Sequence, residues 1–326
     1  MPLSWEPSCA LELLPLRAEM LGRIRAFFAS EDVLEVETPL LGQGIGSDPH
    51  LDFFSVNHSL SLQDTALFLQ TSPEFAMKRL LAAGSGSIFQ ICKAFRDGEA
   101  GRLHNPEFSM LEWYRLDYDL GQLMAETAEL LHDLLDGYVP LAVEERFSYA
   151  EVFGQYTGID AQQFDVSDYR RCAEGHGLPE AAELCGSDHA LWLDFLFSHL
   201  VQPFLGRNSI CMVHDYPACQ AALARLKPED SRLAERVEVF VNGLELGNGY
   251  RELTDVREQR RRFLQDAAAR SQRGLPAATV DERFLAALDA GLPDCSGMAI
   301  GLDRVLMLIA GCSEIDAVLT FPVARA

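Results

Sequence analysis

Apolar residues near the start of the chain recur at the spacing of a helix face. From Leu16 to Phe28 they fall every four positions, with further apolar neighbours beside them. Residues 33–38 then alternate apolar and acidic side chains and stop at Pro39, which is typical of an edge strand. The pattern therefore predicts a helix over 16–30 followed by a short edge strand.

Between Phe89 and Tyr114, two apolar runs flank a polar stretch. Arg96 ends the first run, and Phe108 begins the second just after Pro106. The charged and amide residues between them have no hydrophobic period, so the pattern predicts strand, loop, strand. Other apolar stretches predict helices at 75–83, 120–135, 150–156 and 190–205, and a buried strand at 209–213.

The clearest hairpin signal is Asn242-Gly243, which stands between two apolar runs. Asn-Gly favours a two-residue type I′ turn, and such a turn sets the register of the flanking strands. The expected facing pairs are Val241 with Leu244, Phe240 with Glu245, Val239 with Leu246, and Glu238 with Gly247. After Leu246, the segment Gly247-Asn248-Gly249 predicts a bend or bulge.

Two acids of this hairpin share one face of the sheet in the expected register. Because side chains alternate along a strand, Glu238 and Glu245 become diagonal neighbours, at ~7–8 Å between their backbones. Two carboxylates at that spacing can share a hard cation, and Mg²⁺ is often held by a few carboxylates together with phosphate oxygens. The pattern alone is equally consistent with two solvent-facing acids on an exposed sheet face.

Composition and charge indicate which classes of protein this chain can belong to. With 326 residues, 48% of them hydrophobic and 23% charged, the chain resembles an ordinary globular protein. No apolar run is long enough to cross a bilayer, and the N-terminus shows no secretory signal. The eight cysteines form no CxxC pair, which favours reduced thiols in the cytoplasm over a zinc site.

The net charge of −22 comes from 27 basic and 49 acidic residues. A protein that wraps nucleic acid usually offers it a basic face, so we expect no tRNA partner. We interpret the basic run at 257–262 as a solvated helix face. The expected location is the cytoplasm, without membrane attachment.

Three segments resemble, in order, the motifs of class II aminoacyl-tRNA synthetases. Residues 17–39 resemble motif 1, residues 89–114 resemble motif 2, and the Gly301-Leu302-Asp303-Arg304 run within 297–309 resembles motif 3. The His-Asn-Pro-Glu-Phe and Leu-Glu-Trp-Tyr runs, with the earlier Thr-Ser-Pro-Glu run, are most similar to the lysyl branch. The similarity extends from about Leu16 to the C-terminus.

The resemblance implies an α+β fold, with one class II synthetase catalytic domain over 1–326 built on a mostly antiparallel sheet flanked by helices. A helical insertion is expected at about 118–205, and the motif 1 helix and strand are expected to form the interface of a homodimer. Only about fifteen residues precede motif 1, so no anticodon-binding domain is expected there. Within the branch, the chain is most similar to short paralogues that attach a lysine-type amino acid to elongation factor P.

The resemblance also implies a site for ATP and Mg²⁺. Arg96 and Arg304 are the expected catalytic residues, acting on the α-phosphate and at the γ-phosphate end. Phe108 is expected to stack on adenine, and Glu238 and Glu245 to hold Mg²⁺. The expected ATP contacts are Arg96, Asp97, Gly98, Glu99, His104, Asn105, Phe108, Glu245, Leu246, Gly301 and Arg304.

One part of the motif 2 loop departs from the family pattern. The family shows Arg-x-Glu, with the acid on the adenine amino group, whereas the order here is Arg96-Asp97-Gly98-Glu99. Gly98 would let the loop reshape so that Glu99 takes this role. Asn105 is a better candidate than His104 for a contact with ATP.

By the same resemblance, the amino acid substrate is surrounded by Ser72, Glu74, Glu112, Tyr114, Glu252 and Ala299. Three carboxylates and a phenol repel one another unless a cation lies among them, which favours a substrate with two ammonium groups. Ala299 stands where tRNA-charging lysyl enzymes usually have glycine. Its methyl group is expected to crowd α-lysine and to fit (R)-β-lysine, a discrimination of about 1–3 kcal/mol.

These assignments predict an ATP-dependent ligase that activates a lysine-type amino acid, (R)-β-lysine, as an adenylate and transfers it to a lysine side chain of elongation factor P. One alternative is a truncated lysyl-tRNA synthetase that charges tRNA or a tRNA-like target; the acidic charge and Ala299 argue against it. Another is a catalytically silent amino-acid sensor; the presence of Arg96, Arg304 and the acid pair argues against it.

Overall fold

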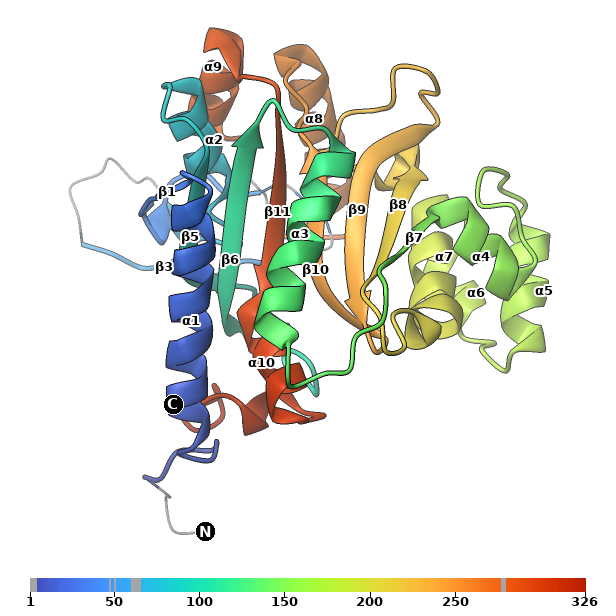
Figure 1. Cartoon of the computed structure of the whole chain (residues 1–326). Coiled ribbons are helices and arrows are strands. Elements are labelled where there is room, and N and C mark those ends of the chain that lie inside the picture. The colour runs from blue at the N-terminus through green and yellow to red at the C-terminus, as the bar shows by residue number, and fades with distance from the viewer. Residues whose placement is uncertain (1–4, 47, 50, 60–65, 277–279) are drawn as a thin grey trace. The chain divides into compact units, whose positions relative to one another are not determined.

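The computed structural model describes residues 5–46, 48–49, 51–59, 66–276 and 280–326 (Figure 1). The chain divides into two compact units. Unit 1 is formed by the chain up to Asp117, by Asp133–Tyr138 and by the chain from Thr254 onward, and unit 2 by Tyr118–His132 and Val139–Leu253. Within the described ranges, no helix has the length and apolar character needed to span a membrane.

Unit 1 is built on a sheet of four strands. Its elements are α1 (Leu13–Ser30), β1 (Leu34–Glu35), β2 (Leu41–Gly42), β3 (Ser55–Val56), β4 (Leu67–Leu69), α2 (Glu74–Ala82), β5 (Ile88–Phe95), β6 (Glu107–Leu116), α8 (Val256–Gln272), α9 (Glu282–Gly291), β11 (Cys295–Gly301), α10 (Leu302–Ala310) and the 3₁₀ turn Ile315–Ala317. The strand order is β1-β5-β6-β11, and a smaller sheet has the order β2-β4-β3. Only β1 and β5 pair in parallel in the larger sheet of this unit.

Helix α1 covers β5 and β6 (Figure 1). Its buried positions Met20, Ile24 and Phe28 are the stripe that the apolar period predicts. The Phe28 ring stacks on Phe89 with the centroids 4.5 Å apart and lies 5.4 Å from Trp113. This packing fixes β5 and β6, the two strands of motif 2, against α1.

Unit 2 combines four strands with a cluster of helices. Its elements are β7 (Glu145–Ser148), α4 (Tyr149–Thr157), α5 (Val166–Gly175), α6 (Ala181–Cys185), α7 (His189–Leu196), a π turn (Phe197–Val201), 3₁₀ turns (Gln202–Phe204 and Ala218–Gln220), β8 (Cys211–Pro217), β9 (Leu233–Val241) and β10 (Leu244–Arg251). Helix α3 (Leu120–Leu135) runs through the boundary of the two units in the sequence. The strand order is β10-β9-β8-β7, antiparallel except for β7 with β8.

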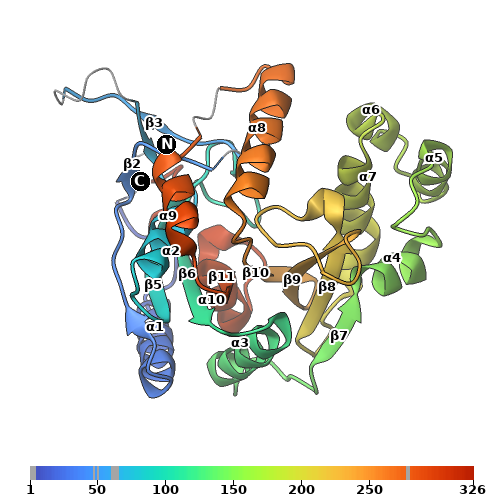
Figure 2. The ribbon, with the colours of Figure 1, turned by 90° about the horizontal axis from the view of Figure 1, so that it is seen from above.

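Helices α4 to α7 gather beside β7 and β8 (Figure 2). Their shared core is aromatic and includes Tyr149, Phe153, Trp192 and Phe197, together with Phe240 from β9. These helices fall within the expected insertion at 118–205. The expected single helix at 190–205 is instead interrupted, because the α-helix ends at Leu196 and a π turn and a 3₁₀ turn follow.

The observed elements agree with the α+β architecture and with the mostly antiparallel pairing that the sequence implies. The expected edge strand at 33–38 is shorter than predicted: only Leu34 and Glu35 pair, in parallel with β5 at the edge of the sheet. All eight cysteines are free thiols. The basic run on α8 is largely a solvated face, as interpreted, since Arg257, Arg260 and Arg261 are exposed. Arg260 pairs with Glu282, and Arg261 and the less exposed Arg262 pair with Glu258.

The β9–β10 hairpin turns at Asn242-Gly243, whose positive φ values of 51° and 75° are those of a type I′ turn. The first expected pairs form, up to Glu245 with Phe240. The later expected pairs are wrong, because a bulge between Glu245 and Gly247 adds one residue to β10 at Leu246. The observed pairs are Gly247 with Val239 and Asn248 with Glu238.

Candidate active site

In unit 1, four residues of the expected amino-acid site come together around Glu112. This β6 side chain is 2% exposed. Its carboxylate accepts hydrogen bonds from Ser72 Oγ at 2.8 Å and from Tyr114 Oη at 2.6 Å. Ala299 lies directly opposite it on β11. Ser72 also accepts the backbone N–H of Glu74 at 3.0 Å and so orders the start of α2.

A buried lysine that the sequence argument omitted also belongs to this cluster. Lys78 is 1% exposed, and its Nζ donates to the Glu74 carboxylate at 2.5 Å. It also lies 6.0 Å from the centroid of the Tyr114 ring. Lys78 therefore supplies a cation among these carboxylates even without a substrate, contrary to the expectation from the sequence. When Glu112 is ionised, the side chains of Glu74, Glu112 and Lys78 together carry one net negative charge, which one added ammonium would balance.

The electrostatics of the cluster depend on the burial of Glu112. Burial, and then the neighbouring charge of Glu74, raise the pKa of the Glu112 carboxyl from 4.5 to about 7. Hydrogen bonds from Tyr114 and Ser72 and the charge of Lys78 act in the opposite direction. A second cation beside Glu112 would favour the ionised carboxylate, so this site is suited to an ammonium ligand.

At the end of β5, the motif 2 arginine lies over an aromatic ring. The guanidinium carbon of Arg96 is 5.0 Å from the centroid of Phe108. Its Nε is buried and has no hydrogen-bond partner among the residues that the structure describes, and its Nη1 lies 3.6 Å from Glu99. A buried, unsatisfied donor on a fixed cation fits an anionic ligand such as phosphate.

Two further residues of the expected ATP-binding set, His104 and Arg304, are linked to Arg96 through Glu99 of the motif 2 loop. His104 Nε2 lies 3.9 Å from the Glu99 carboxylate, and Arg304 Nη2 lies 2.7 Å from His104 Nε2. The expected catalytic residue of motif 3 is thereby brought to the motif 2 loop. Gly301, also in the expected set, is the N-cap of α10.

Other residues of the motif 2 loop form hydrogen bonds with backbone groups. Asn105 is buried; its side-chain N–H₂ donates to the Glu107 carbonyl at 2.6 Å and its Oδ1 accepts the Val323 N–H at 3.0 Å. The Asp97 N–H donates to the Asp52 carbonyl at 3.0 Å. Gly98 has a φ of 77°, which glycine adopts without steric cost. The expected contacts of these residues with ATP stay predictions.

A buried acid of motif 3 connects the three motifs. Asp303 is 1% exposed, pairs with the Arg17 guanidinium, and accepts the Ser109 N–H at 2.7 Å. Arg17 comes from motif 1 and Ser109 from motif 2. Asp303 had no predicted role of its own, because its partners Arg17 and Ser109 lie far from it in the sequence.

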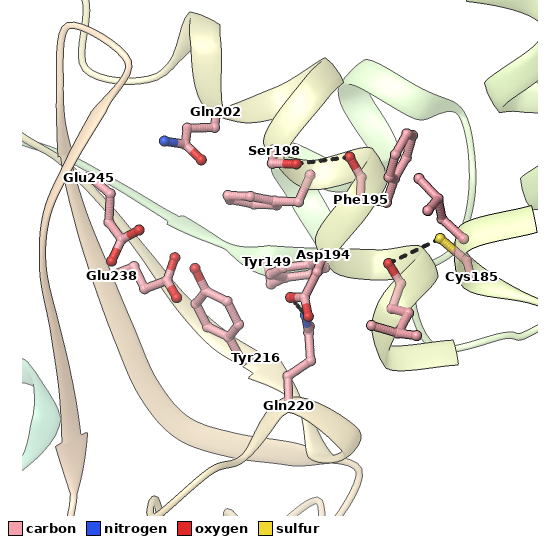
Figure 3. A pocket seen from close by; sticks show the side chains of 13 residues that line it. Tyr149, Cys185, Asp194, Phe195, Ser198, Gln202, Tyr216, Gln220, Glu238 and Glu245 are labelled. Atoms are coloured by element: carbon pink, nitrogen blue, oxygen red, sulfur yellow. Dashed lines mark hydrogen bonds between the residues drawn. The ribbon is translucent and has the colours of Figure 1, made fainter. Parts of the chain in front are cut away.

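In unit 2, Glu238 and Glu245 line one pocket of about 400 Å³ (Figure 3). The bulge leaves them on the same face, as expected. Glu238 pairs with Arg236 at 2.5 Å, and the guanidinium of Arg236 lies 4.6 Å from the centroid of the Tyr216 ring. Burial, together with the charge of Glu245, raises the pKa of Glu238 to about 7 against the lowering effect of Arg236.

These two acids fit a hard divalent cation only together with other oxygens. In the described part of the chain, no cluster of three or more histidines, cysteines or acids is arranged to hold a metal ion. Two carboxylates that share the remaining positions with phosphate oxygens are typical of Mg²⁺. Leu246 is buried at the bulge beside them, and Glu252 is buried just beyond β10. Their expected roles stay predictions.

A family model and a search for relatives agree on the family that this chain resembles. The family model described as tRNA synthetases class II (D, K and N) matches residues 6–325. The elongation factor P–(R)-β-lysine ligase of Pasteurella multocida (strain Pm70) is 44% identical over 325 residues, which cover 99% of this chain and 98% of that protein. The proteins of the same name from Klebsiella pneumoniae (strain 342) and Salmonella dublin are 45% and 44% identical over 328 residues, with the same coverage.

Proposed function

The chain belongs to the class II tRNA synthetases, and on that premise we propose that it is an ATP-dependent ligase that joins (R)-β-lysine to a lysine side chain of elongation factor P. The names of its full-length relatives support this assignment. The observation in the structure that carries it is the cluster of the buried Glu112 and Lys78 with the half-buried Glu74. With Glu112 ionised, its net negative charge suits an amino acid with an additional ammonium group.

The first step forms an adenylate. The carboxylate oxygen of the amino acid attacks the α-phosphorus of ATP, an O–P bond forms, the bond to the β-phosphate oxygen breaks, and pyrophosphate leaves. Arg96 stabilises the charge that develops on the α-phosphate, and Arg304 binds the γ-phosphate end, so these residues act by positioning and electrostatics. When bound by Glu238 and Glu245, Mg²⁺ supplies further neutralisation of phosphate charge.

The second step forms an amide. The uncharged amine of the acceptor lysine attacks the acyl carbon of the adenylate, the C–N bond forms, and the C–O bond to AMP breaks. AMP leaves as the anion, and the amine releases one proton. A protein acceptor agrees better than tRNA with a net charge of −22.

We also propose a cytoplasmic homodimer whose interface is formed by α1 and β1. Two large apolar side chains of these elements, Leu14 on α1 and Leu34 on β1, are exposed in the single chain. A second copy of the chain would remove them from water, which is favourable by about 25 cal/mol per Å² of apolar surface.

The test of the enzyme assignment is amino-acid-dependent exchange of pyrophosphate into ATP, with (R)-β-lysine, α-lysine or no amino acid. We expect strong exchange with (R)-β-lysine and weak exchange with α-lysine. Arg96→Gln should lower exchange by about 10²–10³-fold, whereas Arg102→Gln, on an exposed residue of the same loop, should leave it unchanged. Preference for α-lysine would favour tRNA charging, and no exchange despite ATP binding would favour a sensor.

A further inference from the structure

The pocket in unit 2 extends well beyond the two acids expected to hold Mg²⁺. Glu238 and Glu245 project from their strands at one side, and the ring of Tyr216 lies between them and a polar pair, Asp194 and Gln220 (Figure 3). Asp194 comes from α7, and Gln220 ends the 3₁₀ turn after β8. The Asp194–Gln220 pair has no part in the adenylation chemistry described above.

An unsatisfied acceptor points to a missing ligand at this pair. Gln220 is 7% exposed, and its Nε2 donates to Asp194 Oδ1 at 2.5 Å. Its Oε1 is buried without a hydrogen-bond partner among the described residues. A buried acceptor without a hydrogen bond is unfavourable, because it has lost water and gained no partner, so a ligand that donates a hydrogen bond here would be stabilised.

The lining of the pocket indicates which donor it takes. Three of the thirteen described residues that line it are carboxylates. Glu238 is paired with Arg236 and is expected, with Glu245, to hold Mg²⁺, so Asp194 is the carboxylate left for a further cation. A primary ammonium brings three donors and no acceptor, which matches the Asp194 carboxylate beside the Oε1 of Gln220. The aromatic side chains of Tyr149, Phe195 and Phe197 provide apolar walls for an alkyl stem.

The volume of the pocket limits the size of the ligand. Its volume of about 400 Å³ lies near the lower end of the roughly 300–1,000 Å³ usual for small-ligand sites. It therefore has room for one extended side chain rather than for a folded segment. An alkylammonium side chain of a partner protein satisfies both the size and the lining.

We propose that this pocket takes up the acceptor lysine of the partner protein as an ammonium, with Asp194 and the Oε1 of Gln220 as its contacts, before the side chain loses its proton and attacks the adenylate. The inference rests on the proposed ligase function. In that function the free amino acid is assigned to the residues around Glu112, and no residue is assigned to the cation of the acceptor lysine.

The first test separates transfer from activation. Asp194→Asn keeps the side-chain shape but removes the charge, and Gln220→Met removes the unsatisfied acceptor. Each variant should raise the KM for elongation factor P about tenfold in the transfer assay, the effect of one charge-assisted hydrogen bond, with pyrophosphate exchange on (R)-β-lysine unchanged. Glu174→Gln, the same loss of charge on an exposed position of α5, should leave both unchanged.

A second test needs no catalysis. Nα-acetyl-lysine methylamide, which carries only a side-chain ammonium, should bind the wild-type protein in an NMR titration, and Asp194→Asn should weaken that binding. The norleucine counterpart, which lacks the ammonium, should not bind. Thermal unfolding of each variant, compared with the wild type, checks that the fold is kept.

Each outcome supports or overturns the assignment of the pocket to the acceptor lysine. A KM for elongation factor P that stays unchanged in both variants would overturn it, and so would a loss of exchange as large as the loss of transfer, because the pocket would then serve the free amino acid. If the wild-type protein transfers nothing, the proposed ligase function fails, and the titration alone decides the pocket. Binding of the blocked lysine that Asp194→Asn does not weaken would then overturn the inference.

Discussion

Among single residues, Glu112 is the expected substrate contact whose pKa depends most clearly on burial and on neighbouring charge. Its pKa of about 7, raised by burial and by Glu74, lies above the 4.5 of an exposed glutamate. Between about pH 4.5 and 7 the folded chain therefore binds a proton that the unfolded chain has lost, and the contribution of Glu112 to stability falls as pH rises through this window. A bound ammonium would lower the pKa of Glu112 again, because it favours the ionised carboxylate.

Binding of (R)-β-lysine should accordingly release a proton below pH 7. We expect the affinity to rise between about pH 5.5 and 7 and to level off above it. Calorimetric titration in two buffers of different ionisation enthalpy measures the released proton. Glu107→Gln, on an exposed position of the same strand, should leave the release intact, and proton uptake or no pH dependence would contradict the role of Glu112.

Ala299 makes a separate prediction about the isomer, because it lies directly opposite Glu112 in the sheet register. Ala299→Gly removes the methyl group and should increase exchange with α-lysine relative to (R)-β-lysine by about tenfold, within the 10–200-fold range of one methylene. Ile300→Val, one residue along the same strand and buried, should keep the preference. An unchanged ratio in Ala299→Gly would remove Ala299 from the specificity of the site.

The sequence predicted part of this site and missed another part for a physical reason. Period two along β6 places Glu112 and Tyr114 on one face, and the structure joins them by a hydrogen bond. Lys78 was missed, although it follows Glu74 by four residues on one helix. That spacing usually marks an exposed ion pair, and only the packing of Tyr114 and Phe284 around Lys78 makes it a buried one.

Between elements, Asp303 is the main polar connection of the three motifs. Asp303→Ala removes the acceptor of Arg17 and of the Ser109 N–H and leaves a partly buried guanidinium without it. We expect a loss of about 3–5 kcal/mol in the free energy of unfolding, measured by urea denaturation. Asp289→Ala, at an exposed position of α9, should change it by less than about 0.5 kcal/mol, and equal effects would refute a connecting role for Asp303.

The β9–β10 hairpin shows which features a local sequence pattern predicts and which it does not. Asn242-Gly243 predicted the turn, because its φ values are accessible to these residue types. The bulge was placed one residue late, since periodicity does not reveal where an extra residue enters a strand that contains Gly247 and Gly249. The break after Leu196 was missed for a similar reason, as the apolar residues continue without interruption through the π turn.

For the whole molecule, the fold class followed from the order of three motifs rather than from any one element. The acidic balance agrees with a protein acceptor, and the basic run on α8 is paired within its own unit through Glu258 and Glu282. The family match over residues 6–325 agrees with the extent of the resemblance seen in the motifs. The central claim therefore concerns what the whole chain attaches, and to which macromolecule.

The most direct measurement is the intact mass of purified elongation factor P after incubation with this protein, ATP, Mg²⁺ and (R)-β-lysine, with α-lysine and with total tRNA in parallel reactions. The account predicts that elongation factor P gains the mass of one lysine residue, with (R)-β-lysine preferred, and that tRNA is not charged. An unmodified elongation factor P alongside charged tRNA would contradict it.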